Sequence, residues 1–258
     1  MTPRIFLAEA LFAESTLALP APAVRHVQAL RLQAGDAITL FSGSDDAEWP
    51  ATIVEIGRNR VVVRTAAPVI VARELGCDVT LAIGMPANDR MDALVEKAGE
   101  LGVAAIQPLV CARSVLRLAG ERAEARRRHW QAVAAAASEQ CGRTRVAAVL
   151  PIATLAEWLR ARDAAPDDAA IVLSFAPSTV DPERALVALT STGRPGRRRV
   201  VVLSGPEGGL APDEEDAAAA RGFVRVGLGP RVLRADTAPL ALLAWLGVHM
   251  LAVEGDRR

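Results

Sequence analysis

The strongest constraint on the fold is the regular alternation of strand-like and helical patterns that begins at Cys77. Short apolar runs bounded by turn residues predict strands, whereas apolar residues that recur at helical spacing predict helices. The expected strands are residues 78–84, 104–110, 169–174, 199–203 and 223–227, and the expected helices are residues 121–141, 155–162, 182–190, 212–221 and 237–253, with a further helix between a cap at Asn88 or Asp89 and a stop at Gly102. Alternating strands and helices predict an α/β fold with a mainly parallel sheet.

The N-terminal part of the chain has a different pattern. Short β-like segments at residues 4–7, 37–41, 51–56 and 60–64 are separated by turn signals, and one helical segment lies within residues 22–32. This pattern predicts a small β-barrel. Pro68 and Gly76 interrupt the chain between residues 66 and 76, so we expect one domain in residues 1–72 and a second in residues 73–258.

The charge of the whole chain excludes a general attraction to nucleic acid or membrane. Basic and acidic residues number 30 each, so the formal net charge is zero. Any contact with a polyanion must therefore come from a local patch of positive charge.

Cysteine usage and the chain ends indicate the compartment. The three cysteines are far apart and form no C-x-x-C pair, so neither a disulfide framework nor a bound metal is expected. The first residues lack the features of a signal peptide. The most apolar stretch, residues 240–253, is shorter than the roughly 20 residues that a membrane-spanning helix needs. We therefore expect a cytoplasmic location.

The first segment with chemical significance is the loop Leu203-Ser204-Gly205-Pro206-Glu207-Gly208-Gly209-Leu210. It follows an apolar strand and precedes a helix. Its glycines let the backbone approach a ligand closely, and Pro206 stiffens the turn. The alternative interpretation is an ordinary strand-to-helix connection. The loop fits neither the G-x-G-x-x-G fingerprint nor the phosphate loop that ends in Gly-Lys-Ser/Thr, so phosphate is not the expected ligand.

A second loop, from Leu228 to Thr237, also leaves a strand and enters a helix. It contains Gly229 and Pro230, while Asp236 or Thr237 can cap the following helix. Two such loops at the carboxyl ends of neighbouring strands form the usual ligand crevice of an open α/β sheet. Arg231 and Arg234 place positive charge beside that crevice, although the alternative interpretation is that they are solvated loop residues.

These two loops, together with Glu100-Leu101-Gly102-Val103 and Glu139-Gln140-Cys141-Gly142-Arg143-Thr144-Arg145-Val146, resemble the RsmE family of ribosomal RNA (uracil-N3)-methyltransferases in the SPOUT superfamily. The likeness runs nearly end to end. It implies a PUA-like RNA-binding barrel followed by a catalytic domain that threads a trefoil knot. It also implies S-adenosylmethionine as cofactor, 16S ribosomal RNA within the small subunit as substrate, and a homodimer. The apolar helix at residues 237–253 suits a core or a dimer interface.

The resemblance also implies a set of site residues in this sequence. The implied cofactor-binding residues are Leu173, Phe175, Leu203, Gly205, Pro206, Glu207, Gly208, Leu228, Gly229, Pro230, Val232, Leu233 and Thr237. The sequence departs from the family pattern at Ala235-Asp236-Thr237, where relatives usually have Thr-Glu-Thr, and this shortens an acidic side chain by one methylene. Ala211 replaces the common Ser or Thr cap after the first loop, which weakens the helix start by about 1 kcal/mol.

Methylation at uracil N3 sets a chemical requirement, because N3 carries a proton and offers no free lone pair. The enzyme must take that proton or stabilise the anion that spreads onto the neighbouring carbonyl oxygens. Arg234 is the expected stabilising cation, and Asp236 or Glu207 is expected to orient the substrate or remove the proton. Glu207 has an alternative interpretation as a carboxylate that bonds loop amides.

N3 lies on the pairing edge of the base, so the target must be unpaired or flipped out of its stack. Aromatic residues make up only 3% of the chain, so base stacking is expected to contribute little. The expected phosphate contacts are Arg4, Arg25, His26 and Arg31 in the barrel and Arg113, Arg117, Arg143 and Arg145 beyond it, each of which has the alternative interpretation of a solvated surface residue.

Two other classes of function are compatible with parts of the sequence. The chain could be a non-catalytic RNA-binding assembly factor that retains the fold, in which case it would not take up S-adenosylmethionine. It could also be an enzyme that uses another nucleotide such as NAD. The missing G-x-G-x-x-G and the lack of an acidic ribose ligand in context disfavour that third class.

Overall fold

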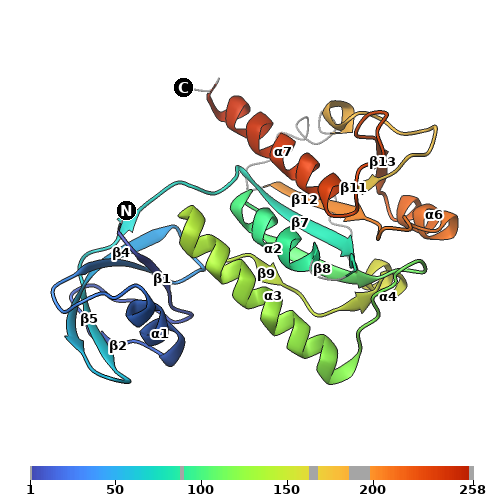
Figure 1. The fold of residues 1–258 in the computed structure, drawn as a ribbon. Helices are drawn as coiled ribbons and strands as arrows, with labels where there is room; N and C mark the ends of the chain where they lie inside the picture. Colours follow the sequence, from blue (N-terminus) through green and yellow to red (C-terminus); the bar gives the residue numbers. More distant parts are fainter. Residues whose placement is uncertain (1, 88–89, 163–167, 186–197, 256–258) are drawn as a thin grey trace. The chain divides into compact units, whose positions relative to one another are not determined.

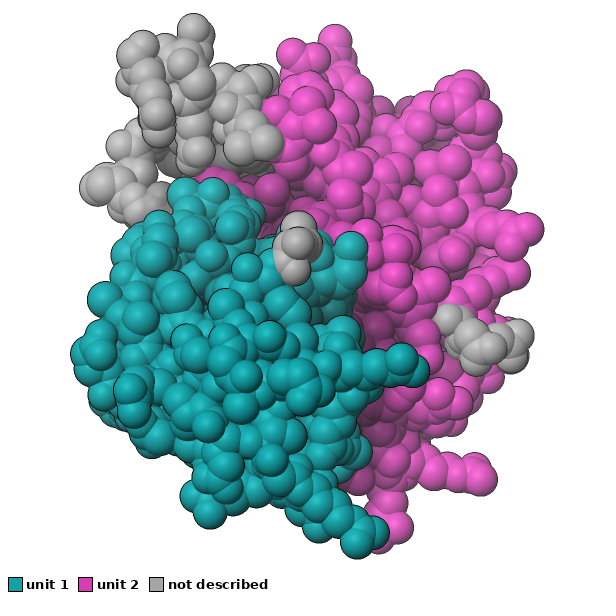
Figure 2. All heavy atoms as spheres, turned by 60° about the vertical axis from the view of Figure 1, so that its left-hand side comes forward, with its two compact units in different colours: residues 1–74, 135–146 teal, residues 75–134, 147–258 magenta. Residues whose placement is uncertain are grey.

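The computed structural model describes residues 2–87, 90–162, 168–185 and 198–255. The chain forms two compact units (Figure 2), of which unit 1 comprises Met1–Glu74 with Ala135–Val146 and unit 2 comprises Leu75–Ala134 with Ala147–Arg258. Unit 1 is therefore discontinuous in sequence. The expected division between residues 72 and 73 did not include the second segment, and as a statement about domains it stays a prediction.

Unit 1 is built on a six-stranded sheet in the order β1-β3-β4-β5-β2, with β6 paired to β4. Its elements are β1 (Arg4–Phe6), β2 (Thr16–Ala18), α1 (Ala21–Ala29), β3 (Ala37–Phe41), β4 (Ala47–Ile56), β5 (Val61–Thr65) and β6 (Val69–Ile70). The small β domain expected from the sequence is confirmed. β2 and β6 were not expected, because runs of three and two residues are too short to show an alternating pattern.

The core of unit 1 follows from the two-residue period of its strands. Ile5, Leu40 and Val63 are fully buried in one cluster, which α1 covers with Val24 and Val27. Pro22 stands in the first turn of α1, where its missing N–H costs little.

A network of polar contacts holds residues 135–146 to the rest of unit 1. The Arg143 guanidinium donates from Nε to both carboxylate oxygens of Glu74, at 3.1 and 3.0 Å. The two side chains are only 5% and 7% exposed. Glu139 accepts a hydrogen bond from the backbone N–H of Phe6 at 2.9 Å, and Arg4 donates to the carbonyl oxygen of Arg143 at 2.8 Å. Unit 1 thus depends on both of its sequence segments.

These contacts already engage Arg4 and Arg143, two residues that were expected to bind RNA phosphates, and that role stays a prediction. Arg4 is paired with Glu48 and its side chain is 8% exposed, while Arg143 is enclosed with Glu74. A buried guanidinium that is already paired with a carboxylate does not face a polyanion, and separating such a pair is costly. Arg145 is also paired, with Asp46 at 2.7 Å, but about two fifths of its side chain remains exposed.

Unit 2 contains an all-parallel seven-stranded sheet in the order β10-β8-β7-β12-β11-β13, with β9 paired to β8 (Figure 1). Its strands are β7 (Cys77–Gly84), β8 (Ala105–Val110), β9 (Ala148–Val149), β10 (Ala153–Thr154), β11 (Asp168–Leu173), β12 (Arg198–Ser204) and β13 (Val224–Val226). Its helices are α2 (Arg90–Glu100), α3 (Gly120–Cys141), α4 (Leu155–Ala161), α6 (Pro212–Ala220) and α7 (Thr237–Gly255), and the last residues of α3 belong to unit 1. The expected α/β fold with a parallel sheet is confirmed.

Helices cover both faces of this sheet, as buried parallel strands require. On one face, Leu159 of α4 and Ala218 of α6 pack in a cluster with Ala82 of β7. Leu81 and Ile83 alternate with Ala82 and point to the other face, where α2 and α7 lie (Figure 1). The fully buried residues of β7 thus separate two helical layers.

Some expectations for unit 2 remain open. Of the helix expected at residues 182–190, the first four residues are helical and the rest lie outside the described residues. The two-residue strands β9 and β10 were not expected. The trefoil knot stays a prediction, since strand order and register do not define how the chain threads.

Within the part of the chain that the structure describes, helix α7 has one buried side and one exposed side. Leu242, Leu243 and Leu246 are fully buried, whereas Val248 is 68% exposed. Despite its apolar sequence, neither α7 nor any other helix in the described residues has the length and hydropathy to cross a membrane.

The packing of α3 on α2 predicts a measurable loss of stability. Trp130 is 1% exposed, and its indole N–H donates to Asp92 Oδ1 at 2.9 Å. Asp92→Ala leaves this buried donor without a partner, so we expect the free energy of unfolding to fall by about 1–3 kcal/mol. Asp92→Asn keeps an acceptor oxygen and should lose less. Urea unfolding of both variants measures the difference, and equal stabilities would contradict the role of this hydrogen bond.

Candidate functional site

The candidate site is a cavity of about 980 Å³ in unit 2. Strands β12, β11 and β13 are neighbours and run parallel, so their carboxyl ends lie at one edge of the sheet. The loops that follow these three strands form most of the wall, which is the usual place for a ligand in an open α/β sheet. The lining residues are Arg90, Arg113, Leu173, Ser174, Phe175, Ala176, Ser178, Ser204, Gly205, Pro206, Glu207, Gly208, Gly209, Leu210, Pro212, Glu215, Asp216, Arg225, Val226, Leu228, Arg231, Val232, Leu233, Arg234, Ala235 and Ala238.

The loop after β12 is a tight turn that only glycine allows. A Cβ on Gly205 would lie 2.7 Å from the backbone N of Leu210 and 2.8 Å from the carbonyl carbon of Gly209. The Gly209 N–H donates to the Pro206 carbonyl oxygen at 2.8 Å and closes the turn. Gly84, at the end of β7, makes room for Pro206, because a Cβ there would lie 2.5 Å from the proline Cδ. The glycines therefore allow a tightly closed loop at the cavity wall.

Glu207 is engaged with the chain that leads into α2. Its Oε1 accepts a hydrogen bond from the Ala87 backbone N–H at 2.9 Å and lies 3.5 Å from Arg90 Nη1. This geometry supports the interpretation of Glu207 as a carboxylate that bonds a loop amide. Its side chain lines the cavity, but one of its oxygens already has a partner.

Arg113 braces the same loop from the end of β8. Its Nη1 donates to the carbonyl oxygens of Gly208 at 3.0 Å and Leu210 at 3.2 Å. Arg113 was expected to bind RNA, and the structure instead places it in the cavity wall with its guanidinium on loop carbonyls. Because carbonyl oxygens carry partial negative charge, the guanidinium stabilises the turn that Gly205 begins.

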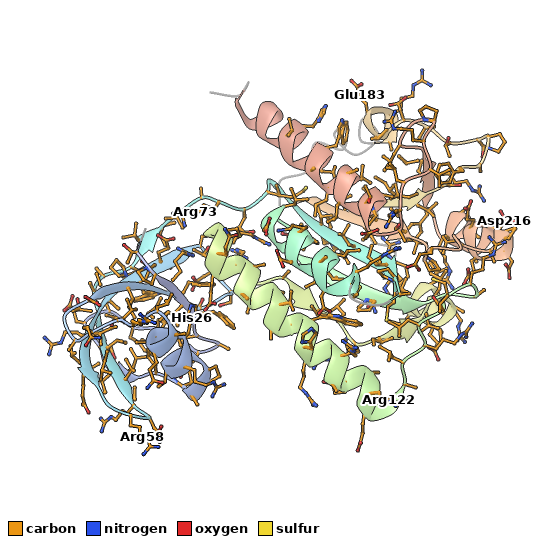
Figure 3. The ribbon with its side chains drawn as sticks, viewed as in Figure 1. His26, Arg58, Arg73, Arg122, Glu183 and Asp216 are labelled. Carbon is orange, nitrogen blue, oxygen red and sulfur yellow. The ribbon has the colours of Figure 1, made fainter. Side chains whose placement is uncertain are left out.

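A polar cluster lines the cavity between β11 and α6. Ser174, only 7% exposed, donates to Glu215 Oε2 at 2.8 Å. Arg225 of β13 lies 3.5 Å from the same Glu215 oxygen and donates to Asp216 Oδ1 at 2.6 Å. Asp216, labelled in Figure 3, lies on α6. This cluster fixes the loop after β11 to the helix that follows β12.

The loop after β13 brings two exposed arginines, Arg231 and Arg234, to the cavity. The Arg234 carbonyl oxygen accepts from the N–H groups of Thr237 and Ala238, both at 3.0 Å, and so begins α7. Asp236 lies just outside the lining. Its Oδ1 is buried and has no hydrogen-bond partner among the described residues.

The structure gathers most, but not all, of the expected site residues. Those that line the cavity are Leu173, Phe175, Gly205, Pro206, Glu207, Gly208, Leu228, Val232, Leu233 and Arg234. Those outside the lining are Leu203, Gly229, Pro230, Asp236 and Thr237. Leu203 is fully buried in the sheet core, which explains its absence from the wall.

Several lining residues escaped the sequence analysis. Ser174 follows β11 directly, so its position at a strand end was an available signal. Glu215 and Arg225 gave no such signal, because their contact depends on how α6 packs beside β13. Arg90 joins the cavity from α2, far away in the sequence. Among the described residues, no group of three or more His, Cys, Asp or Glu side chains forms a candidate metal site.

Cys111, which lies beside the loop after β12, is expected to be a poor nucleophile. Burial raises the pKa of its thiol to about 12, and the nearby Glu214 carboxylate adds to the effect. A raised pKa means less thiolate, and at pH 8 only on the order of one thiol in 10,000 is ionised. Iodoacetamide at pH 8 should therefore label Cys141, which is half-buried, well before Cys111. Peptide mass spectrometry of the alkylated protein measures the order, and early labelling of Cys111 would contradict the raised pKa.

Comparison with known proteins defines the class of this fold and site. The family model for an RNA methyltransferase domain matches residues 73–247, and the family model for an RNA methyltransferase PUA domain matches residues 19–65. The first match covers unit 2 up to residue 247 and includes every residue that lines the cavity. The chain is therefore a member of the RNA methyltransferase class with a PUA domain.

Individual relatives narrow this class to one family. Ribosomal RNA small subunit methyltransferase E from Bacillus subtilis is 28% identical over 94% of this chain and 93% of that protein. A crystal structure of ribosomal RNA small subunit methyltransferase E from Neisseria gonorrhoeae bound to S-adenosyl methionine is 34% identical, with a TM-score of 0.83, over 95% of this chain and 97% of that one. The structure of a putative methyltransferase from Legionella pneumophila with bound cofactor SAM is 30% identical, with a TM-score of 0.85, over 96% of this chain and 98% of that one. The chain belongs to the ribosomal RNA small subunit methyltransferase E family.

Proposed function

We propose that this protein transfers a methyl group from S-adenosylmethionine to N3 of a uracil in small-subunit (16S) ribosomal RNA. The observation that carries the proposal is the cavity itself. A tight glycine turn and a loop with two arginines face one space, in a chain of the small subunit methyltransferase E family. A donor and an acceptor can therefore meet beside positive charge.

The residues of the cavity fit S-adenosylmethionine. A volume of about 980 Å³ is at the upper end of the range for small-molecule sites and leaves space for a second group beside the cofactor. The closed turn that Gly205 permits brings loop backbone to the cavity wall, where it can bind a nucleoside. Leu173, Leu228 and Leu233 supply apolar contact for its flat ring. The cofactor-binding residues that we propose are Leu173, Gly205, Pro206, Glu207, Gly208, Leu228 and Leu233.

When bound, S-adenosylmethionine supplies an electrophilic methyl group on a sulfonium. The chain must then expose a lone pair on uracil N3. The role that we assign to Arg234, which lines the cavity, is to stabilise the anion of the deprotonated base through the carbonyl oxygens of that base. Asp236 is a better candidate than Glu207 for orienting the base or accepting the N3 proton, because Asp236 Oδ1 has no partner in the described chain while Glu207 Oε1 bonds Ala87.

The RNA contacts that we propose lie on exposed basic residues. Arg25 on α1 and Arg31 just after it are exposed, and His26 on α1 is about one third exposed, at 3.5 Å from Glu139 (Figure 3). Contacts from basic side chains to phosphates fix the position of a protein on nucleic acid without reading sequence. Recognition through phosphates depends on the shape of the RNA. We therefore propose the intact small subunit, in which the RNA is folded, as the form of the substrate.

We further propose a homodimer in the cytoplasm. The exposed side of α7 carries Val248 and His249, and its sequence is apolar almost throughout. A second copy of the chain would remove this apolar surface from water. Ribosomal RNA is the substrate, so the enzyme works where ribosomes are assembled.

Methylation itself tests the proposal. Purified protein, S-adenosylmethionine and small subunits from a strain that lacks the gene should give one N3-methyluridine, located by mass spectrometry of RNA fragments. Naked 16S RNA is the comparison substrate and should react more slowly. No methylated uridine with either substrate would reject the proposal. Calorimetry separates the alternative, since a non-catalytic assembly factor would not bind S-adenosylmethionine.

A further inference from the structure

Phe175 is an aromatic residue in an unusual place. It lines the cavity from the loop after β11, and yet it is 67% exposed. Among the described residues the only other large aromatic with such exposure is Phe12, in unit 1 and away from the cavity. Most of the Phe175 ring area thus faces solvent at the cavity rather than the protein interior.

The backbone on both sides of Phe175 is fixed. The Ser174 N–H donates to the Val226 carbonyl oxygen at 3.0 Å, and the Ala176 N–H donates to Ser174 Oγ at 3.0 Å. Ser174 Oγ in turn donates to Glu215 at 2.8 Å. An exposed ring on a fixed backbone is ready to make contact with little further loss of conformational freedom.

The charge around Phe175 suits a nucleotide. Arg231 and Arg234 line the same cavity from the loop after β13, and both are exposed. Guanidinium groups bind phosphates and carbonyl oxygens, whereas an aromatic face binds the face of a base. The two kinds of group therefore offer contacts for different parts of one nucleotide.

We propose that Phe175 is the platform on which the unpaired target uracil stacks, an inference that rests on the proposed function. Stacking engages the flat face of the base and leaves its N3 edge and carbonyl oxygens free for Arg234 and the methyl donor. This assignment differs from the implied role of Phe175 in cofactor binding. It also limits the expectation that stacking contributes little, because one well-placed ring is enough for one flipped base.

Three variants of Phe175 and one control test this role. Phe175→Leu keeps an apolar side chain without an aromatic face, Phe175→Ala removes the side chain, and Phe175→Tyr keeps the ring. Phe12→Ala is the matched control, because Phe12 is also 67% exposed. The probe is a fluorescent uridine-containing single strand, whose dissociation constant is measured with S-adenosylhomocysteine present, beside kcat/KM on small subunits.

We expect the Phe175 variants to lose affinity for RNA and activity on it, but not affinity for the methyl donor. Phe175→Leu and Phe175→Ala should weaken strand binding and lower kcat/KM by about 10- to 100-fold, while Phe175→Tyr stays within about threefold of the wild type. Calorimetry should give an unchanged dissociation constant for S-adenosylmethionine in all variants. Phe12→Ala should bind the strand as the wild type does.

Four outcomes would overturn the inference. Wild-type binding by Phe175→Leu would show that any apolar group suffices, and an equal loss in Phe12→Ala would show a general surface effect. A matching loss of S-adenosylmethionine affinity would return Phe175 to the cofactor. If sedimentation showed a dimer for the wild type and a monomer for the Phe175 variants, the ring would be assigned to a contact with a second copy of the chain. A wild-type protein without methylation activity would instead reject the proposed function, and the strand-binding measurement would still decide the role of Phe175.

Discussion

Arg234→Ala is expected to lower kcat on small subunits by about 100- to 1,000-fold, the usual cost of removing a group that stabilises a developing anion. Arg234 lines the cavity and is exposed, so it can reach the carbonyl oxygens of a bound uracil. It is not among the residues that shape the glycine turn. The dissociation constant for S-adenosylmethionine, measured by calorimetry, should therefore stay within about twofold of the wild type.

Arg231→Ala is the matched comparison, because Arg231 lies on the same loop, is exposed and lines the same cavity. A group that only attracts phosphate should change KM more than kcat. We expect kcat of Arg231→Ala to fall by less than about tenfold. Wild-type turnover by Arg234→Ala on assembled subunits would remove Arg234 from the chemistry.

Gly205→Ala is expected to weaken S-adenosylmethionine binding by on the order of 100-fold, as displacements of about 1 Å in a site can do. The added Cβ would lie 2.7 Å from Leu210 N and 2.8 Å from the Gly209 carbonyl carbon. Both are backbone atoms, so the turn itself must move. Calorimetry measures the affinity, and circular dichroism establishes that the fold is retained.

Gly57→Ala serves as the control for a glycine substitution in general. A Cβ on Gly57 would meet the Arg60 carbonyl oxygen at 3.6 Å, an ordinary contact, and Gly57 lies outside the cavity. This variant should bind the methyl donor like the wild type. If Gly205→Ala also bound it normally, the glycine turn would not be part of the donor site.

The sequence predicted those parts of the fold in which apolar residues recur at a regular spacing. The strands and helices of unit 2 alternate over most of its length, and a repeating pattern averages out local ambiguity. Strands such as β6, with two residues, have no period to detect. The pairing of Arg143 with Glu74 was also out of reach, because 69 positions separate the two residues and only the tertiary fold brings them together.

The same difference between local patterns and tertiary contacts separates the site residues that the sequence predicted from those that it missed. Gly205 and Pro206 were found because a turn has a local signature in the choice of residues. Arg234 was found through its place in a family motif. Glu215, Arg225 and the braced position of Arg113 were missed, since their roles come from contacts between elements that are distant in the chain. The exposure of Phe175 likewise has no signature in sequence.

The discontinuity of unit 1 sets a rule for exchanging modules between relatives. A chimaera joined at residue 74 would take Glu74 and Phe6 from one parent, and the residues that bind them, Arg143 and Glu139, from the other. A transplanted N-terminal module must therefore bring residues 135–146 with it. Over evolutionary time, substitutions in either segment are constrained by the other, although the sixty residues 75–134 lie between them in the chain.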